Sequence, residues 1–248
     1  MLIKCIHCGG SCHEHGKEEY ECDFCGAIFS KEEATLTLKK QVYVETSSFD
    51  NGVDVFNKNV NGVLEVMTST SSGSGYLISN DGYAITNSHV VALDSGKPYH
   101  TCKVKVGGVV VAATIVAMGT ENKAMHCTNS DLALLKLSRV PRNATPLQFA
   151  RGEVKTGERI FVIGNSLGAG TCITSGIISD NNRNGQLMYD CPTNPGNSGG
   201  PVFNYKGEVI GTHVASLKPH DIAVQGMNFA IPTSAVKRFI DQVRRSRF

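Results

Sequence analysis

The sequence predicts a largely all-β fold, with a small cysteine-rich module before it and one helix at its end. The 248 residues are 41% hydrophobic, which is enough to bury a sizeable core. The 26 glycines and the scarcity of helical periodicity favour many short strands joined by turns. We therefore expect a module over residues 1–40, a connecting segment over residues 41–62, and a β domain with its closing helix over residues 63–248.

The first 40 residues carry two matching Cys-x-x-Cys turns. Each turn presents two thiolates from one tight loop, and two such turns supply the four soft ligands of a tetrahedral zinc site. The region resembles a zinc ribbon, with zinc supplying the folding free energy, because 40 residues bury too little surface to fold unaided. A pair of disulfides or a redox motif stays open as an alternative. The paired spacing selects Cys5, Cys8, Cys22 and Cys25 as ligands, with Cys12, His7, His13 and His15 as substitutes.

The charge of this module argues against a general nucleic-acid surface. Seven acidic residues stand against five basic residues before position 41, so phosphate contacts are not favoured. We expect the module to recruit a protein or capture a substrate. The segment after it, residues 41–62, contains Tyr43, Phe49 and Phe56 and is expected to be a linker whose aromatic side chains pack on the β domain.

Turn residues place the strands of the β domain. Residues 80–82 (Asn-Asp-Gly) separate apolar runs at 76–79 and 83–86 and predict a hairpin, because Asp-Gly tolerates positive φ. Residues 204–207 separate 202–203 from 208–211 in the same way. Further strands are expected over residues 103–106, 109–116, 132–137, 159–163, 172–179 and 227–231.

A helix is expected to close the chain. Residues 232–234 (Pro-Thr-Ser) supply a start and a cap, and Val236, Phe239, Ile240 and Val243 recur at spacings that make one apolar face. Its other face is basic. Two interpretations stay open for that face: attachment to an acidic surface, or solvated charge that complements the helix C-terminus. The basic residues are Lys237, Arg238, Arg244, Arg245 and Arg247.

The glycine-rich run at residues 196–200 (Gly-Asn-Ser-Gly-Gly) contains the best nucleophile candidate, Ser198. A serine that attacks a carbonyl needs an oxyanion hole, and backbone N–H groups form one best where no Cβ blocks the approach. We therefore expect the turn of Gly196, Asn197 and Ser198 to form that hole, with Gly196 and Ser198 as donors.

Two further residues complete a catalytic triad. His89 follows an apolar strand and would act as the general base, and Asp131 precedes another strand and would fix the tautomer of His89. The order His, Asp, Ser along the chain is that of the chymotrypsin arrangement. Each residue also has a structural interpretation, His89 as a capped loop residue and Asp131 as a turn residue.

Motifs around these residues resemble the trypsin-like serine proteases of the HtrA (Deg) family over residues 63–232. The resemblance implies two six-stranded antiparallel barrels, with His89 and Asp131 on the first and Ser198 on the second. It also implies hydrolysis of protein or peptide substrates through an acyl-enzyme. A homotrimer assembled by the aromatic segment at 41–62 is a further hypothesis. The motifs are residues 73–78, 86–91, 130–137, 164–168, 174–179, 194–200 and 228–232.

The residues expected to line the specificity pocket depart from that family. HtrA proteins usually carry aliphatic or asparagine residues there, and they commonly carry PDZ domains, which we do not expect in this chain. Thr193 and His213 are similar to residues of glutamyl endopeptidases and of viral proteases that cut after Glu or Gln. We expect Thr193, His213 and Ser216 to donate hydrogen bonds to a Glu, Gln or Asp side chain. The alternative is a buried core His213, with Met227 narrowing the pocket for small aliphatic side chains.

The remaining expectations concern location and competing functions. Residues 1–4 run directly into the first Cys-x-x-Cys turn and no apolar stretch approaches membrane-spanning length, so we expect a cytoplasmic protein without membrane contact. Two other functions stay open: a catalytically silent peptide-binding or chaperone module, and a nucleic-acid-associated factor. The cysteines outside the module, expected to be reduced, are Cys102, Cys127, Cys172 and Cys191, although Cys172 and Cys191 are expected on neighbouring strands.

Overall fold

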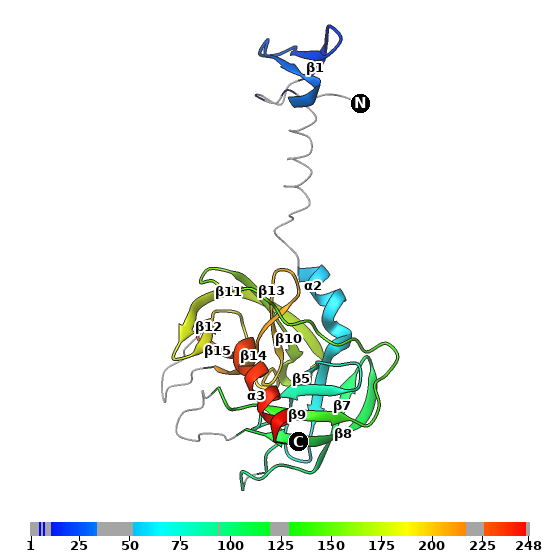
Figure 1. The fold of residues 1–248 in the computed structure, drawn as a ribbon, viewed down its shortest axis with the longest axis vertical. Helices are drawn as coiled ribbons and strands as arrows, with labels where there is room; N and C mark the ends of the chain where they lie inside the picture. The colour runs from blue at the N-terminus through cyan, green and yellow to red at the C-terminus, as the bar shows by residue number, and fades with distance from the viewer. Residues whose placement is uncertain are drawn as a thin grey trace. The chain divides into compact units, whose positions relative to one another are not determined.

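The protein was analysed as a computed structural model, which describes residues 5, 7, 11–33, 52–93, 95–119, 129–216 and 226–246 (Figure 1). The chain divides into two compact units, Met1–Asp50 and Asn51–Phe248. We call the first the cysteine-rich unit and the second the barrel unit.

The cysteine-rich unit contains a three-stranded antiparallel sheet in the order β1-β2-β3. Among the described residues of this unit, Cys5, Cys22 and Phe29 are buried together, and the ring of Tyr20 packs beside Phe29 with centroids 6.2 Å apart. Two of these three buried side chains are thiols, so apolar burial alone is a weak source of stability for this unit. The strands are β1 (Cys12–His15), β2 (Glu19–Cys22) and β3 (Ile28–Ser30).

The first half of the barrel unit is a closed six-stranded barrel in the order β4-β5-β6-β9-β8-β7. Strand β7 shows how the strands divide inside from outside: its sequence alternates, so that Cys102, Val104 and Val106 are buried while the residues between them are exposed. The buried side chains fill the barrel interior. The strands are β4 (Val63–Met67), β5 (Ser72–Leu77), β6 (Tyr83–Thr86), β7 (Thr101–Val106), β8 (Val109–Met118) and β9 (Ala133–Leu137).

The second half is another closed six-stranded barrel, in the order β10-β11-β12-β15-β14-β13. Its own interior is filled by a separate set of buried side chains, among them Ile160, Val162 and Tyr189. In Figure 1 the two barrels lie side by side in the barrel unit. The strands are β10 (Arg159–Asn165), β11 (Thr171–Arg183), β12 (Gln186–Tyr189), β13 (Pro201–Asn204), β14 (Val209–Ser216) and β15 (Asn228–Pro232), with a 3₁₀ turn at Ser166–Gly168.

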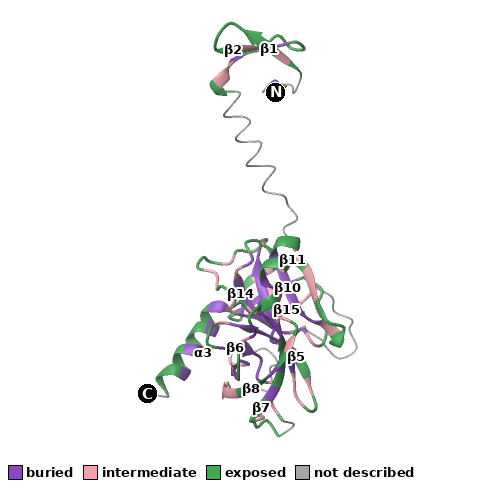
Figure 2. Ribbon diagram, turned by 90° about the vertical axis from the view of Figure 1, so that its right-hand side faces the viewer, coloured by how far each residue is buried: buried purple, intermediate pink, exposed green. Residues whose placement is uncertain are grey.

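A third core joins the barrels to each other and to two helices. It includes Tyr76 from the first barrel, Phe203 from the second, Val55 from helix α2 (Gly52–Asn59) and Val236 from helix α3 (Thr233–Arg245). Figure 2 shows α3 with buried and exposed residues on different sides. This shared core fixes the barrels against each other, and with them the groups that each contributes to a site.

The expected all-β class, the two six-stranded barrels and the closing helix are confirmed. Both expected hairpins are present, as β5–β6 and β13–β14. Pro232 occupies the position before α3 without a side-chain cap, and the Thr233 hydroxyl donates to the Val209 carbonyl at 2.9 Å instead. None of the described helices is long and apolar enough to cross a membrane.

Part of the expected linker belongs to the barrel unit. Residues 52–59 form α2, and a 3₁₀ turn at Val60–Gly62 leads from it into β4. Val55 is buried and Phe56 packs against the shared core, so the helix is held by burial that the composition of the segment did not reveal. Tyr43 and Phe49 lie outside the described residues.

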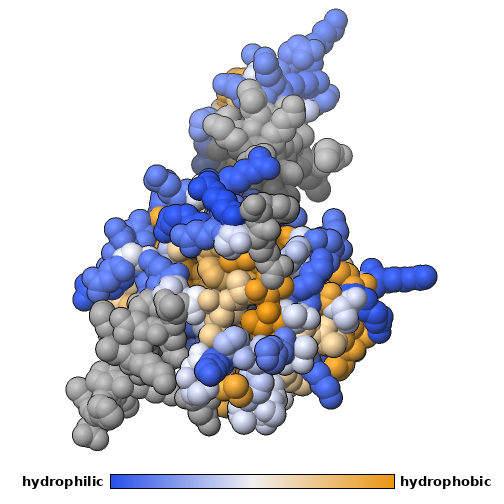
Figure 3. All heavy atoms as spheres, turned by 60° about the horizontal axis from the view of Figure 1, so that its bottom comes forward, coloured by the Kyte–Doolittle hydropathy of each residue, from blue (hydrophilic) through white to orange (hydrophobic). Residues whose placement is uncertain are grey.

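The surface of the barrel unit is not uniformly polar. On the face shown in Figure 3, hydrophobic residues gather between hydrophilic ones. Large hydrophobic side chains that the unit exposes include Leu93, Val110, Leu167 and Ile177. Scattered exposed side chains of this kind are normal on soluble proteins and assign no function by themselves.

Candidate active site

His89 and Asp131 are brought together by the pairing of β6 with β9. Thr86 at the end of β6 pairs with Ala133 at the start of β9, so the residues just after one strand oppose those just before the other. His89 Nδ1 lies 2.7 Å from Asp131 Oδ2, and the His89 backbone N–H donates to Asp131 Oδ1 at 3.1 Å. The Asp131 side chain is 6% exposed and that of His89 is 33% exposed. The carboxylate is therefore buried while the imidazole reaches solvent.

Two buried neighbours hold this pair in place. The Asn87 side chain donates to the Asp131 carbonyl at 2.7 Å, and the Ser88 hydroxyl donates to the Leu132 carbonyl at 3.1 Å. Because these bonds join the chain before His89 to the chain around Asp131, they fix the approach of the two side chains. The sequence motif contained Asn87 and Ser88 but gave no sign of this bracing.

Ser198 lies on a turn from the second barrel that packs against the first. The Ser74 N–H on β5 donates to the Ser198 carbonyl at 2.8 Å. Gly199 has φ +83°, and a Cβ there would collide with the Ser74 carbonyl and the Thr86 hydroxyl. This close approach requires glycine, and it brings the Ser198 turn beside the strand that leads to His89. The Ser198 hydroxyl donates to the Val214 carbonyl at 3.2 Å.

The turn before Ser198 has the backbone arrangement of an anion-binding site. Gly196 has φ +99°, and the Asn197 N–H is used within the turn, where it donates to the Asn194 carbonyl at 3.1 Å. Among the described residues, the N–H groups of Gly196 and Ser198 have no hydrogen-bond acceptor. The structure thus separates Asn197, which shapes the turn, from Gly196 and Ser198, whose donors can meet a substrate oxygen.

Ser74 fixes this turn from the other barrel, a contact that the sequence did not indicate. Its hydroxyl donates to the Gly196 carbonyl at 2.7 Å and accepts from the Asn165 N–H at 2.8 Å. The Leu167 N–H donates to the Pro195 carbonyl at 2.7 Å. Since a trans peptide places its C=O and N–H on opposite sides, that bond directs the Gly196 N–H away from Leu167.

The four residues expected to line a specificity pocket differ in their contacts and burial. The Thr193 hydroxyl donates to Asn228 Oδ1 at 2.6 Å, which differs from the expected donation to a substrate because a hydroxyl has only one proton. His213 Nδ1 lies 2.5 Å from the Tyr189 hydroxyl, a partner that the sequence did not suggest. The backbone of Ser216 pairs with Asn228, and its side chain lies outside the described structure. Met227 is half-buried.

His213 is an uncharged histidine. Burial, assisted by the nearby His89, lowers the pKa of its imidazole to about 3, and the Phe229 backbone acts in the opposite direction. Burial also raises the pKa of the Tyr189 phenol well above its usual value. The two groups therefore meet as a neutral imidazole and a protonated phenol near neutral pH.

The cysteine-rich unit gathers sulfur atoms. The Sγ atoms of Cys5, Cys12 and Cys22 lie within 4.8 Å of one another, and Cys5 Sγ is 3.7 Å from Cys25 Sγ. The backbone N–H groups of His7, Phe24 and Cys25 donate to sulfurs of this group at 3.4 Å. Cys12, ranked as a substitute ligand from the sequence, thus lies with two of the four expected cysteines, Cys5 and Cys22, while Cys25 approaches Cys5. Cys8 lies outside the described residues.

The imidazoles of the unit have other contacts. His13 Nδ1 is 2.6 Å from Asp23 Oδ1, and His15 Nδ1 is 2.9 Å from Glu21 Oε2. None of the described cysteines forms a disulfide. In the barrel unit, Cys191 Sγ contacts the Thr174 hydroxyl at 3.0 Å and Cys172 Sγ donates to the Gly164 carbonyl at 3.6 Å, so these two have separate partners.

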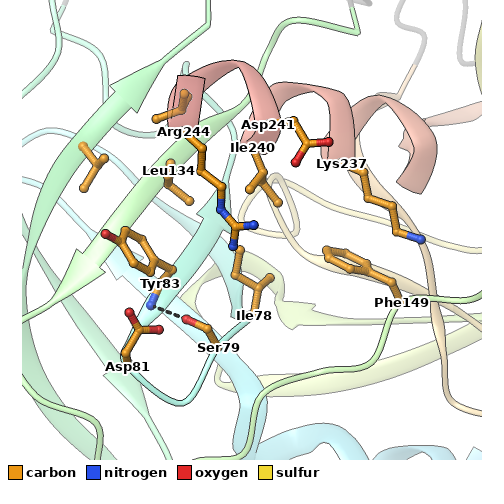
Figure 4. A pocket seen from close by; sticks show the side chains of 12 residues that line it. Ile78, Ser79, Asp81, Tyr83, Leu134, Phe149, Lys237, Ile240, Asp241 and Arg244 are labelled. Carbon is orange, nitrogen blue, oxygen red and sulfur yellow. Dashed lines mark hydrogen bonds between the residues drawn. The ribbon is translucent and has the colours of Figure 1, made fainter. Parts of the chain in front are cut away.

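A cavity of about 650 Å³ lies between α3 and the first barrel (Figure 4). Its floor is apolar, with Ile78, Leu134 and Ile240, and charged side chains such as Lys237 and Arg244 lie around it. None of His89, Asp131 and Ser198 lines it. The cavity is therefore separate from the candidate active site.

Comparisons with known proteins agree with this geometry. Residues 73–211 match the family described as trypsin-like peptidase domain. A probable periplasmic serine endoprotease, DegP-like, of Brucella suis is 35% identical over 184 residues, covering 70% of this chain and 33% of that protein. The protein of the same name from Rhizobium meliloti is 36% identical over 184 residues, with the same coverage. The chain thus spans about a third of the length of these curated relatives.

A solved structure also has a similar fold. The crystal structure of the serine endoprotease from Yersinia pestis superposes with a TM-score of 0.64 at 28% identity, covering 77% of this chain and 65% of that one.

The cytoplasmic location expected from the sequence is wrong, because the relatives are named periplasmic proteins. That expectation rested on the first residues of the sequence and on the absence of an apolar stretch of membrane-spanning length. Twelve strands in two closed barrels and a family match over residues 73–211 show that the chain belongs to the trypsin-like peptidase domain family.

Proposed function

We propose that the chain is a serine endopeptidase that hydrolyses peptide bonds in proteins or peptides through Ser198, His89 and Asp131. The observation that carries this proposal is the 2.7 Å contact of His89 with a buried Asp131, beside a glycine turn that presents Ser198. The relatives named serine endoproteases support it.

The buried carboxylate sets the direction of proton transfer. Asp131 accepts a hydrogen bond from His89 Nδ1–H, which leaves Nε2 as the basic nitrogen. Ser198 Oγ attacks the substrate carbonyl carbon while its proton passes to Nε2, and that proton then goes to the departing amine. Water repeats the sequence on the acyl-enzyme, so that Ser198 regains its proton and the acid is released.

Two features of the second barrel assist this step. The N–H groups of Gly196 and Ser198 stabilise the oxyanion as it forms. The Ser198 hydroxyl, which donates to the Val214 carbonyl at 3.2 Å, turns from that carbonyl to His89 for the attack. Rotation of a serine side chain between staggered positions is a small motion.

The side chain before the scissile bond is proposed to be polar, with Glu, Gln and Asp as candidates. Support comes from the polar groups that Thr193 and His213 place next to the Ser198 turn. Sites whose polar groups bond the substrate side chain discriminate by about 10⁴-fold against side chains that cannot make those bonds. Cleavage after small aliphatic residues is the alternative, and the half-buried Met227 is the residue that favours it.

The experiment compares Ser198→Ala with the wild type on a diverse peptide library. We expect kcat to fall by about 10⁴-fold or more, because the nucleophile is lost while binding remains. Ser138→Ala, at an exposed position after β9, is the matched control. A Ser198→Ala variant that loses no measurable activity would favour a silent peptide-binding or chaperone module.

We also propose that the cysteine-rich unit holds one zinc ion through Cys5, Cys22 and Cys25, with Cys8 as the fourth ligand and Cys12 as its substitute. Zinc thiolate bonds of about 2.3 Å place tetrahedral sulfurs about 3.8 Å apart, and Cys5 and Cys25 are separated by 3.7 Å. A disulfide needs about 2.05 Å. N–H groups directed at the sulfurs favour their thiolate form.

Metal analysis tests this second proposal. Zinc content per chain should fall from about one to near zero in Cys22→Ser, whereas Cys102→Ser, a buried cysteine on β7, should keep it. Cys8→Ser and Cys12→Ser compared in the same way identify the fourth ligand. Equal zinc in Cys22→Ser and the wild type would reject the site.

The assembly and the partner of the unit stay hypotheses. We propose that the cysteine-rich unit recruits a protein, and that a homotrimer forms through Tyr43 and Phe49. Phe56 packs against the shared core of its own barrel unit. A monomer at micromolar concentration in analytical ultracentrifugation would overturn the trimer.

A further inference from the structure

The cavity between α3 and the first barrel leaves apolar side chains partly uncovered. We call it the α3 cavity. Ile78, Tyr83, Val116 and Phe149 line it and pack against the core between the barrels, yet they are only partly buried. Its volume of about 650 Å³ falls in the range of about 300–1,000 Å³ that is typical of small-molecule sites. The cavity therefore has the size and the apolar surface to hold a small ligand.

One edge of α3 places charged groups at this cavity. Lys237, Asp241 and Arg244 recur there at helical spacing, line the cavity and are exposed. Lys237 Nζ lies 5.6 Å from the centroid of the Phe149 ring. In Figure 4 the Arg244 side chain extends from α3 toward Ile78, so its guanidinium lies among the lining side chains. The described part of the chain provides no ion pair or hydrogen-bond acceptor for that guanidinium.

Positive charge is in surplus at the α3 cavity. Of the residues that line it, Asp81 and Asp241 carry carboxylates. Asp81 is already paired, because Lys136 Nζ lies 3.1 Å from Asp81 Oδ2 and also donates to the Asp81 carbonyl. Lys237 and Arg244 are thus opposed by Asp241 alone. The edge of α3 complements a ligand that carries one negative charge.

From the apolar floor and this surplus we infer that the α3 cavity binds an amphiphilic carboxylate of the fatty-acid class. The acyl chain covers the apolar floor at Ile78 and Ile240 and removes it from water. The carboxylate accepts two hydrogen bonds from Arg244, because a planar guanidinium matches a carboxylate in bidentate geometry. No residue of the proposed triad lines the cavity, so this inference does not depend on the peptidase function.

Decanoate, decanol and decylammonium differ in the head group and provide the first test. Isothermal titration calorimetry of the full chain near neutral pH should give about one decanoate per chain, bound about tenfold more tightly than decanol, because hydrogen bonds between charged groups are the stronger ones. Decylammonium should bind more weakly than decanol, because it meets the surplus positive charge. Equal affinities for the three ligands, or no saturable binding of decanoate, would overturn the inference.

Shorter ligands report whether the chain is buried. Octanoate and hexanoate carry the same carboxylate, so they keep the contact with Arg244. The affinity should fall with each CH₂ removed, by up to about fourfold where that group is fully buried. An affinity that does not change with chain length would mean that the carboxylate binds alone, and it would overturn the acyl-chain site.

Two neighbouring arginines of α3 give a matched pair of variants. Arg244→Gln should lower the decanoate affinity about tenfold and leave that of decanol unchanged. Arg245→Gln removes the same charge at the next position, which does not line the cavity, and should leave both affinities unchanged. Asp241→Asn should tighten decanoate binding, because it removes the opposing carboxylate. Equal losses in Arg244→Gln and Arg245→Gln would mean that decanoate follows the overall charge of the helix, against the inference.

Two other occupants are distinguished in the same samples. The three substituted positions are exposed, so the variants should keep the thermal transition of the wild type. Self-association in analytical ultracentrifugation that Arg244→Gln abolishes, without decanoate binding, would assign the cavity to a second copy of the chain. Binding of an acidic apolar peptide without decanoate binding would assign it to a protein partner. Either result overturns the fatty-acid site, whereas decanoate binding with the expected head-group order supports it.

Discussion

The two units of this chain differ in the kinds of side chain that they bury. The barrel unit has three separate sets of buried apolar side chains, one inside each barrel and one between them. In the part of the cysteine-rich unit that the structure describes, the buried cluster is Cys5, Cys22 and Phe29, and two of these three side chains carry sulfur. A domain of barrel size folds by removing apolar surface from water, whereas a unit of this size needs a further source of free energy. The comparison teaches that metal dependence should be confined to one unit.

Removal of zinc should have the largest effect and should act on one unit only. A strong chelator should unfold the cysteine-rich unit, because of order 10 kcal/mol of zinc binding is coupled to folding in sites of this kind. The barrel unit should keep its thermal transition. Amide hydrogen exchange resolved by peptide follows both units in one sample. Loss of protection in the barrels on chelation would break the comparison.

A pair of matched core substitutions gives the next largest effect. Phe203→Ala, in the core between the barrels, should lower the free energy of unfolding of the barrel unit by about 3–5 kcal/mol. Phe29→Ala, in the cysteine-rich unit, should leave that transition unchanged and weaken zinc retention. Urea unfolding and zinc content measure the two outcomes. A Phe29→Ala change that shifts the barrel transition would contradict separate cores.

Acid should act on the barrel unit through His213. Burial lowers the pKa of this imidazole from 6.5 to about 3. Between these two pH values the imidazole is protonated in the unfolded chain and neutral in the folded chain. The free energy of unfolding should therefore fall as the pH drops below 6.5, by up to about 1.4 kcal/mol per pH unit from this group until pH 3. Above pH 6.5 His213 adds no pH dependence.

The measurement is urea unfolding of the wild type and of His213→Asn across this range. The variant should show the shallower decline, since other titrating groups contribute equally to both. Zinc release from the cysteine-rich unit should also increase in acid, because thiolates must lose the metal to bind protons. Identical slopes for the two proteins would mean that His213 titrates normally in the fold.

Much of the candidate site could be read from short motifs. The glycine-rich turn at residues 196–200, together with His89 and Asp131, could be recognised from the sequence alone. A histidine, an aspartate and a serine beside strand ends, in this order along the chain, are the pattern of a chymotrypsin-type triad. Residues that act through their neighbours were not visible in this way. Ser74 orients the Gly196 turn from the other barrel, and Tyr189 orients His213 from another strand. A serine or tyrosine inside an apolar strand looks like an ordinary core residue until its partner is known.

The same division holds for the fold. Turn residues and alternating strands in the sequence determined the all-β class, the two hairpins and the closing helix, because these depend on backbone preferences over a few residues. Only the tertiary structure decided that residues 52–59 form a helix on the barrels, since Val55 gains its burial from residues far along the chain. It also decided that Thr193 donates to Asn228 and Tyr189 meets His213. Sequence determined which chemical groups are present, and packing decided which of them donate, which accept and which stay neutral.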